Sequence, residues 1–413
     1  MKILLLNPAG ALGGAERVLL DAIASAGAIN PCWEFALIAA ANGDLVEAAR
    51  GRGIPTTVLP FPTVLAGLGD AGAGGARWRT LGRLGLASPA VARYSELLAR
   101  AIAGLAPDLV HSNGFKMHLL GARATPDGTP LIWHLHDFTR ARPLMPVLLK
   151  LHVRRVAAIV ANSRSVAADA RSVVGPDVPI QTVYNGVDLA RFSPDGAVAD
   201  LDALANLPPA RGAVVRVGLV ATAARWKGHE RFLQALARLA DLPVRGYVIG
   251  GPIYQTAGSQ FTPAELRAMA KTLGLAGRVG FTGYVREVAP VLRALDVVVH
   301  SSVAPEPFGL VIAEALACGR ALITSALGGA AELVTPEQDA LTYRADDAQA
   351  LAAAIVRLVR DPDLRATLGR AGRLTAEKSF GRERMGAELS TIYRGLASAR
   401  NGRDDASLER RTC

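Results

Sequence analysis

Cysteine is scarce in this chain of 413 residues, which contains only Cys32, Cys318 and Cys413. An odd number of cysteines far apart in sequence argues against a disulfide framework and is typical of a reducing compartment. The chain also lacks the Cys/His spacing of a zinc site. These absences exclude small disulfide-rich and zinc-stabilised proteins, and no metal site is predicted.

Aromatic and charged residues are few, at 5% and 20%, whereas 50% of the residues are hydrophobic. This balance excludes an intrinsically disordered protein, and at about 100 to 200 residues per domain the length predicts two or three domains. Long hydrophobic runs are absent too. No stretch approaches the roughly 18 apolar residues of a membrane span, and the apolar run at residues 3–6 is too short for a signal peptide, so we expect a cytoplasmic protein.

Acidic residues are outnumbered, 36 against 46 Lys and Arg, giving a net charge of +10. Residues 77–155 hold 12 basic and 4 acidic residues, so +8 of that charge is local. No nucleic-acid-binding module or set of stacking aromatics accompanies it, so no nucleic-acid partner is predicted. In segments 77–100 and 140–155 basic and apolar residues alternate as in interfacial helices, which predicts a peripheral membrane contact; a solvated face is the alternative.

Apolar runs of strand length alternate with longer segments of helical period, first through residues 3–184 and again through residues 214–343. This alternation predicts parallel sheets covered by helices. We therefore predict an α/β fold with two doubly wound domains, an N-terminal one at 1–190 and a C-terminal one at 212–378, joined by a linker at 191–211. After the second domain we expect a helix at 379–398 that packs back on the N-terminal domain. Residues 399–413 are predicted to be a disordered tail.

Two loops between a strand and a helix are candidate anion sites. In the first, at residues 7–16, glycines allow a ligand close to the backbone, although an unliganded tight turn is the alternative. The spacing of Gly10, Gly13 and Gly14 does not fit G-x-G-x-x-G, which disfavours a dinucleotide-dependent dehydrogenase.

The second loop, at residues 305–319, is the most informative segment. Pro307 predicts extended geometry at Glu306, and we expect a first helical turn whose backbone N–H groups bind phosphate, those of Phe308, Gly309 and Leu310. Glu314 follows in an apolar helix, where a carboxylate needs a partner or a ligand. Glu306 and Glu314 could together hold a polyhydroxyl ligand.

Glu306 and Glu314 are separated by seven residues, which resembles the E-x7-E signature of retaining GT-B glycosyltransferases of family 4. Further motifs of the family occur in the same order: G-G-A-E at 13–16, H-L-H-D at 134–137, A-N-S at 161–163, N-G-V-D at 185–188, W-K-G at 226–228, G-G-P at 250–252, F-T-G-Y at 281–284 and G-G-A-A-E-L at 328–333. The resemblance covers nearly the whole chain.

The resemblance implies a GT-B fold, in which two Rossmann-like domains face each other across a cleft. It implies a hexosyltransferase of the EC 2.4 class that moves a sugar, with retention, from a UDP- or GDP-sugar to a hydroxyl of a carbohydrate or lipid-linked acceptor. The biosynthesis of a polysaccharide, glycolipid or other glycoconjugate is the expected setting. The resemblance implies that no cofactor or metal is required. The nucleotide sugar is consumed in the reaction and is therefore a co-substrate.

The family pattern also implies the roles of individual residues. His136, Lys227 and Glu306 would be catalytic. The donor would be bound by Arg225, Lys227, Gly251, Tyr284, Val285, Glu306, Phe308, Gly309, Leu310 and Glu314. The acceptor and phosphate loops would use Gly13, Gly14, Asn113 and Asn185.

Two positions leave alternatives open. The family usually has an arginine five residues before the lysine, where this chain has Thr222, so Arg225 is either the second phosphate cation or a solvated surface residue. His134 alternates with His136 on one strand, and is either a core or an acceptor-side histidine. The competing functions are a non-catalytic GT-B scaffold subunit and a GT-B phosphorylase or epimerase. For an enzyme, replacing Glu306 or Lys227 by Ala is expected to abolish donor turnover with little change in melting temperature.

Overall fold

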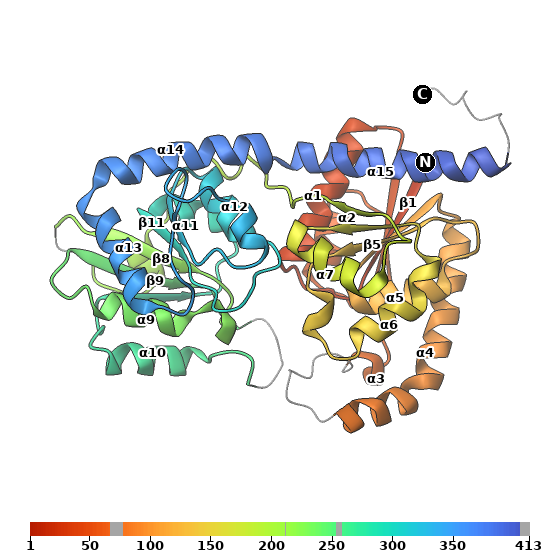
Figure 1. The fold of residues 1–413 in the computed structure, drawn as a ribbon, viewed down its shortest axis with the longest axis horizontal. Helices are drawn as coiled ribbons and strands as arrows, with labels where there is room; N and C mark the ends of the chain where they lie inside the picture. Colours follow the sequence, from red (N-terminus) through yellow and green to blue (C-terminus); the bar gives the residue numbers. More distant parts are fainter. Residues whose placement is uncertain (67–76, 211, 253–257, 405–413) are drawn as a thin grey trace. The chain divides into compact units, whose positions relative to one another are not determined.

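Two compact units make up the chain. The computed structural model describes residues 1–66, 77–210, 212–252 and 258–404. One unit comprises Met1–Gly186 with Arg382–Cys413, and the other comprises Val187–Gly381. Each unit contains one parallel β-sheet with helices packed against it (Figure 1).

The first unit has a seven-stranded sheet in the order β3-β2-β1-β4-β5-β6-β7. Its strands are β1 (Lys2–Asn7), β2 (Glu34–Ala39), β3 (Thr56–Val58), β4 (Leu109–Asn113), β5 (Leu131–Leu135), β6 (Ala158–Ala161) and β7 (Ile180–Thr182). Its helices are α1 (Gly14–Ile29), α2 (Asp44–Arg50), α3 (Thr63–Ala66), α4 (Arg77–Leu105), α5 (Phe115–Ala124), α6 (Met145–His152), α7 (Arg164–Val174) and α15 (Arg382–Asp404), with 3₁₀ turns at Thr139–Ala141 and Val153–Arg155.

Alternate residues of the first sheet face two different layers of helices. Leu4, Val110 and Trp133 belong to a core that also includes residues of α4, α5, α6 and α7. The residues between them, such as His111 on β4, face the other layer, where α15 packs on α1 and Tyr393 of α15 contacts His111. Both faces of the sheet are therefore covered, which explains the apolar runs within β1, β2, β5 and β6.

The second unit has a six-stranded sheet in the order β10-β9-β8-β11-β12-β13. Its strands are β8 (Val215–Val220), β9 (Val244–Ile249), β10 (Val279–Gly283), β11 (Val297–His300), β12 (Ala321–Thr324) and β13 (Leu341–Thr342). Its helices are α8 (Leu201–Leu204), α9 (His229–Ala237), α10 (Pro263–Thr272), α11 (Val288–Ala294), α12 (Leu310–Ala317), α13 (Ala348–Arg360) and α14 (Pro362–Ser379), with 3₁₀ turns at Arg225–Lys227 and Gly329–Glu332.

The strand order reverses at the centre of each sheet, between β1 and β4 in the first unit and between β8 and β11 in the second. In open parallel sheets the crevice outside the carboxyl ends of the strands at such a switch point is where ligands bind. Polar residues end these central strands: Asn7 in β1, Asn113 in β4 and His300 in β11. The topology therefore predicts ligand sites at the loops that follow these strands.

The predicted linker at 191–211 is instead part of the second unit, which begins at Val187. Leu201 in α8 is buried, and the Asp202 carboxylate accepts hydrogen bonds from Arg245 at 2.7 Å and from Tyr247 at 2.8 Å. Both partners lie on β9. These contacts pack the segment onto the sheet, although it lacks the periodicity by which packed elements are recognised in sequence.

The C-terminal helix is longer than predicted. Helix α15 runs from Arg382 to Asp404, rather than over 379–398, and packs on α1 within the first unit, where Gly386 permits close approach to Ser25. The tail predicted from residue 399 is thus helical up to Asp404, because no proline interrupts the chain after residue 381. The rest of that predicted tail, 405–413, lies outside the described residues.

Candidate functional site

The loop after β11 places Glu306 at the carboxyl end of the second sheet. Its backbone pairs with the loop after β12: Glu306 N donates to Leu327 O at 3.1 Å, and Gly329 N donates to Glu306 O at 2.7 Å. A Cβ at Gly328, where φ is 65°, would lie 2.7 Å from Glu306 O. Only glycine fits this close crossing, so the G-G motif at 328–329 fixes the position of Glu306.

The carboxylate of Glu306 is buried in a network of polar side chains. Lys227 Nζ donates to both of its oxygens, at 2.8 and 2.7 Å. Ser302 Oγ donates to Oε2 at 2.9 Å, and His300 Nε2 lies 3.1 Å from the same oxygen. The other ring nitrogen of His300 lies 3.1 Å from Thr324 Oγ1, so residues of β11, β12 and the intervening loop all orient this carboxylate.

Lys227 is held by contacts between the loops that follow β8 and β11. It ends the 3₁₀ turn Arg225–Lys227, and the next residue, Gly228, has φ of 75°. A Cβ on Gly228 would lie 1.8 Å from Ser301 O, so the two loops touch backbone to backbone. Ser301 Oγ donates to Lys227 O at 2.9 Å. The W-K-G motif therefore delivers the ammonium to the switch point between β8 and β11.

Electrostatics keep Glu306 ionised. Burial alone would raise its pKa, but the Lys227 ammonium and the hydrogen bond from His300 hold the pKa of Glu306 well below its ordinary value of 4.5. The side chains of Lys227 and Glu306 are 16% and 9% exposed. A buried pair of this kind leaves both groups charged and available to bind a polar ligand that replaces part of the contact.

The helix after Glu306 begins later than predicted. Helix α12 starts at Leu310, and its N-cap is Gly309 with φ of 96°. Phe308 and Gly309 therefore lie in the turn before the helix, not in its first turn, because left-handed backbone at Gly309 cannot be part of an α-helix. Phe308 is buried and packs edge-on against Phe380, with ring centroids 6.1 Å apart. Glu314 lies in the second turn of α12 and is half-buried.

The predicted base-binding residues lie at the same edge of the second sheet. Gly250 N donates to Gly283 O at 2.9 Å, which joins the ends of β9 and β10 and brings Gly251 close to Tyr284 N. The side chain of Tyr284 is exposed, at 60%, and that of Val285 is half-buried. An open aromatic ring at a strand end can stack on a planar base.

Arg225 is directed to α10. Its guanidinium donates to Glu265 Oε1 and to Gly258 O, each at 3.0 Å, and lies 4.2 Å from the centre of the Phe261 ring. Of the two predicted phosphate cations, the structure brings Lys227 to Glu306 and pairs Arg225 with Glu265. Arg225 is therefore an exposed surface residue in an ion pair, which agrees with the surface alternative, and its phosphate role stays a prediction.

The glycine loop of the first unit is closed by Glu16, a residue that sequence reasoning did not single out. Gly13 N donates to Glu16 Oε2 at 3.2 Å, and Asn7 Nδ2 lies 3.4 Å from Glu16 Oε1. Burial raises the pKa of Glu16 despite these hydrogen bonds. Gly13 caps α1 and Gly14 begins it, so both are at the helix N-terminus, as the predicted anion loop requires.

A set of amide and imidazole side chains lies at the carboxyl ends of five strands in the first unit. His136 Nε2 is 3.3 Å from Asn113 Oδ1, and the rings of His134 and His136 are 4.1 Å apart, which confirms that these two histidines share a face. Six atoms of the set are buried without a hydrogen-bond partner among the described residues: Asn7 Oδ1, Asn113 Nδ2, His134 Nε2, His136 Nδ1, Asn162 Oδ1 and Asn185 Oδ1.

Sequence reasoning gave site roles to Asn113, His136 and Asn185 of this set, but missed the roles of Asn7 in the glycine loop and of Asn162 in the A-N-S motif. The signal was present, because each of the missed residues ends or directly follows a buried apolar strand. Buried polar atoms normally have partners, and one left alone costs about 1–3 kcal/mol. Six of them at one sheet edge indicate a site for a polar ligand rich in hydrogen-bonding groups.

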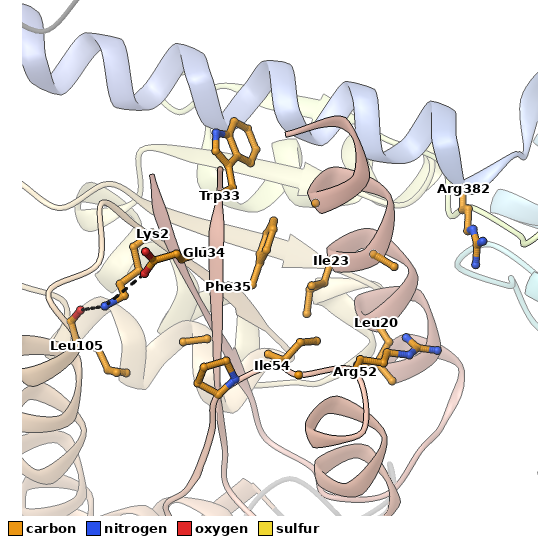
Figure 2. Close-up of a pocket in the computed structure, with 15 residues that line it drawn as sticks. Lys2, Leu20, Ile23, Trp33, Glu34, Phe35, Arg52, Ile54, Leu105 and Arg382 are labelled. Atoms are coloured by element: carbon orange, nitrogen blue, oxygen red, sulfur yellow. Dashed lines mark hydrogen bonds and ion pairs between the residues drawn. The ribbon is translucent and has the colours of Figure 1, made fainter. Parts of the chain in front are cut away.

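A separate groove of about 750 Å³ lies at the opposite, amino-terminal edge of the first sheet (Figure 2). It is lined by the first residues of β1 and β2 and by side chains of α1, among them Lys2, Phe35 and Ile23. Lys2 Nζ donates to Leu105 O at 3.1 Å on its rim. Because the amide and imidazole set lies at the carboxyl ends of the strands, this groove is not part of that site.

No group of three or more His, Cys, Asp or Glu side chains in the described part of the chain is arranged to hold a metal ion. Among the helices that the structure describes, none combines the length and the apolarity needed to cross a bilayer.

Two family models match the chain. The one described as "Glycosyl transferases group 1" matches residues 213–361, and the one described as "Glycosyltransferase Family 4" matches residues 40–191. The D-inositol 3-phosphate glycosyltransferase of Salinispora arenicola is 30% identical over 337 residues, which are 74% of this chain and 72% of that protein. The chain belongs to the family 4, group 1 glycosyltransferases, which are transferases of the EC 2.4 class.

The D-inositol 3-phosphate glycosyltransferase of Xylanimonas cellulosilytica is 33% identical over 252 residues, or 60% of this chain, and the match spans only 58% of that protein. Among solved structures, Anabaena HepE in complex with UDP and glucose is similar with a TM-score of 0.77 and 25% identity, covering 95% of this chain and 99% of that one. The predicted family and the predicted fold of two Rossmann-like parallel-sheet units are confirmed.

Proposed function

We propose that this chain transfers a sugar, with retention at the anomeric carbon, from a nucleotide diphosphate sugar such as a UDP- or GDP-sugar to a hydroxyl of a carbohydrate or lipid-linked acceptor. The observation that carries the proposal is the buried, hydrogen-bonded pair of Lys227 and Glu306 at the switch point of the second sheet. The solved complex of the similar HepE with UDP and glucose supports a nucleotide-sugar donor.

The donor would occupy the carboxyl edge of the second sheet. Glu306 would accept hydrogen bonds from hydroxyls of the transferred sugar, and Glu314 from those of the ribose. The N–H groups before and at the start of α12, those of Phe308, Gly309 and Leu310, would bind the diphosphate. Tyr284, with Val285 and Gly251 beside it, would hold the base.

The acceptor would occupy the carboxyl edge of the first sheet. There the predicted acceptor residues Asn113 and Asn185, and beside them the predicted catalytic residue His136, offer buried hydrogen-bonding atoms without partners among the described residues. Gly13 and Gly14 would bring the N-terminus of α1 close to a phosphate or an acceptor group. This assignment gives each of the predicted acceptor residues a ligand to bind.

In the reaction the acceptor oxygen forms a bond to the anomeric carbon on the face from which the diphosphate leaves. The bond from that carbon to the phosphate oxygen breaks, and the leaving phosphate takes the acceptor proton. Negative charge grows on the diphosphate as its bond breaks, and Lys227 stabilises that charge at the moment when stabilisation lowers the barrier. The scheme requires no metal and no cofactor.

Two other functions remain as alternatives. A non-catalytic scaffold subunit does not need a buried Lys227–Glu306 pair that further side-chain and backbone contacts orient. A phosphorylase with lysine-bound pyridoxal phosphate, or an epimerase, would need residues that the sequence does not supply. The transferase is therefore favoured by the arrangement of charge at the second sheet.

The nucleotide part of the proposal can be tested by thermal unfolding with UDP, GDP, UDP-glucose and GDP-mannose. A ligand that binds only the folded chain at 100 times its Kd stabilises it by about 2.7 kcal/mol. We expect stabilisation by one nucleotide class in the wild type and its loss in Lys227→Met. Arg357→Met is the control, since Arg357 pairs with Glu337 on the surface of the same unit. Equal stabilisation of Lys227→Met and wild type would contradict the site.

The acceptor side also includes a peripheral contact with the inner face of the cytoplasmic membrane. On α6, Val147 and Leu151 are 60% and 71% exposed, and Lys150 and Arg154 beside them are exposed too. Exposed apolar residues flanked by cations suit an anionic lipid surface. The other predicted segment, 77–100, lies in α4, and the side chains of residues 77–88 are outside the described part of the chain.

A further inference from the structure

Three buried side chains from α15, β4 and β5 form a hydrogen-bonded chain in the first unit. The hydroxyl of Tyr393 lies 2.8 Å from His111 Nδ1. His111 Nε2 lies in turn 3.1 Å from His134 Nδ1. All three residues are at most 2% exposed, so water does not compete for these contacts.

The hydrogen bonds between Tyr393, His111 and His134 can be donated in one direction only, from Tyr393 towards His134. Burial raises the pKa of Tyr393 and lowers that of His111 to about 3, so at neutral pH the phenol keeps its hydrogen and the imidazole has one. Among the described residues the hydroxyl of Tyr393 has His111 Nδ1 as its acceptor. Tyr393 therefore donates to His111 Nδ1, which places the hydrogen of His111 on Nε2, from which it is donated to His134 Nδ1.

The hydrogen of His134 is consequently on Nε2, a buried atom without a partner in the described part of the chain. Burial holds the pKa of His134 well below its ordinary value, so this ring is neutral. The reverse direction would leave the hydrogen of the Tyr393 hydroxyl without an acceptor, at a cost of about 1–3 kcal/mol.

His136 beside it offers the complementary atom. Its Nε2 lies 3.3 Å from Asn113 Oδ1, an acceptor, so Nε2 carries the hydrogen and Nδ1 has a free lone pair. His136 Nδ1 is also buried without a partner among the described residues. A single ligand hydroxyl within hydrogen-bonding reach of both atoms would accept from His134 Nε2–H and donate to His136 Nδ1, which would satisfy both atoms with one group.

We propose that Tyr393, acting through His111, fixes His134 as the Nε2–H tautomer, so that His134 and His136 together bind one hydroxyl of the acceptor. The identity of that ligand rests on the proposed function, whereas the tautomer does not. Tyr393 and His111 are positioning residues, because they act through His134. The C-terminal helix is thereby a component of the acceptor site.

The tautomer is tested on the full chain labelled with ¹⁵N-histidine, by recording imidazole nitrogen shifts at neutral pH. Wild type should show His134 protonated on Nε2 alone. Tyr393→Phe removes the hydroxyl and nothing else, so His134 should become a mixture of tautomers. Tyr94→Phe is the matched control, since Tyr94 is a buried tyrosine of the same unit whose hydroxyl donates to Leu59 O at 2.8 Å. A wild-type His134 protonated on Nδ1, or equal spectra of wild type and Tyr393→Phe, would overturn the proposal.

Hydroxyl binding is tested by titrating the same samples with myo-inositol, D-glucose and N-acetylglucosamine. At least one of these polyols should shift the His134 and His136 resonances, with a Kd raised about 5- to 30-fold in Tyr393→Phe, as expected for 1–2 kcal/mol. Tyr94→Phe should keep the wild-type Kd. If no polyol perturbs His134, or if both variants weaken binding equally, the proposal is wrong. Absence of sugar transfer by wild type would contradict the proposed function and leave the tautomer result standing.

Discussion

Lys227 Nζ lies 2.8 and 2.7 Å from the two carboxylate oxygens of Glu306, so one ammonium neutralises one carboxylate in a buried setting. In the proposed reaction both groups bind the donor: Lys227 contacts the diphosphate, and Glu306 accepts hydrogen bonds from the sugar. Their mutual contact holds each charge in place before the donor binds. The contact is also the reason why substitutions at the two positions will not be independent.

Removal of one partner should lower stability, contrary to what the sequence alone led us to expect. Breaking a buried ion pair leaves an unpaired charge and typically costs about 3–5 kcal/mol. We expect Lys227→Met to lower the melting temperature more than the double variant Lys227→Met/Glu306→Gln, in which neither charge remains. Differential scanning calorimetry of both variants checks this order, and a single variant at least as stable as the double one would contradict the buried pairing.

Arg225 should matter much less than Lys227. Its side chain is 47% exposed and paired with Glu265, so its removal takes away a surface contact worth about 0–1 kcal/mol. We expect Arg225→Met to lower kcat/KM for the nucleotide sugar by less than about tenfold, against about 100- to 1000-fold for Lys227→Met, the usual cost of a lost group that stabilises transition-state charge. Comparable losses in steady-state assays would show that Arg225 moves to the donor.

Tyr284 should contribute to nucleotide affinity through its ring. Stacking of a base on an aromatic side chain is worth about 1–3 kcal/mol. Tyr284→Ala should therefore weaken binding of the preferred nucleoside diphosphate, whereas Tyr284→Phe keeps the ring and the affinity. Isothermal titration calorimetry measures both Kd values; if Tyr284→Ala binds as tightly as wild type, the base lies elsewhere.

The first unit should lose stability in mild acid. Burial lowers the pKa of His111 to about 3 and that of His136 to about 4, from an ordinary value of 6.5. The unfolded chain therefore takes up protons below pH 6.5 that the folded chain does not, and the free energy of unfolding should fall between pH 6.5 and about 4.

Urea titrations at several pH values measure this fall. His118 is another buried histidine of the unit, and burial lowers its pKa as well. Replacing it by Asn should reduce the dependence on pH by up to about 1.4 kcal/mol per pH unit, the contribution of one proton. A free energy of unfolding that stays constant from pH 6.5 to 4 would mean that these rings are accessible to protons in the folded state.

The exposed apolar residues of α6 should govern membrane binding. We expect wild type to bind vesicles of phosphatidylglycerol and phosphatidylcholine at low salt, and to bind phosphatidylcholine alone much less. The double variant Val147→Ser/Leu151→Ser should lose most of this binding in a sedimentation assay. Leu374→Ser is the control, because Leu374 on α14 is 66% exposed outside the basic segment. Wild-type binding by the α6 variant would exclude this surface.

The parts that sequence could predict are those that depend on local pattern. Apolar runs predicted the central strands of both sheets, and the resemblance of the segments around Glu306, Glu314 and Lys227 to family 4 motifs led to the proposed donor edge. The contacts that decide roles join distant positions: Lys227 and Glu306 are 79 residues apart, and Arg225 and Glu265 are 40 apart. His111 and Tyr393 are separated by 282 residues, so no local pattern could have revealed their hydrogen bond.

Arg225 shows why such long-range contacts cannot be predicted from local sequence. A cation two residues before Lys227 is equally compatible with a phosphate and with a carboxylate of a neighbouring helix, and only the packing of α10 decides between them. Likewise, Gly309 could be part of a helical turn or end one, and its positive φ decides that α12 begins at Leu310.

Release of nucleoside diphosphate from nucleotide sugars tests the central claim most directly. Wild type, Lys227→Met, Glu306→Gln and the surface control Arg357→Met would each be assayed with UDP-glucose, UDP-N-acetylglucosamine, GDP-mannose and other UDP- and GDP-sugars, in the presence of polyol acceptors. The account predicts release by wild type and Arg357→Met with at least one donor, and a loss of about 100-fold or more in both site variants. Undiminished release by Lys227→Met or Glu306→Gln, or no release by wild type with any of these donors, would contradict it.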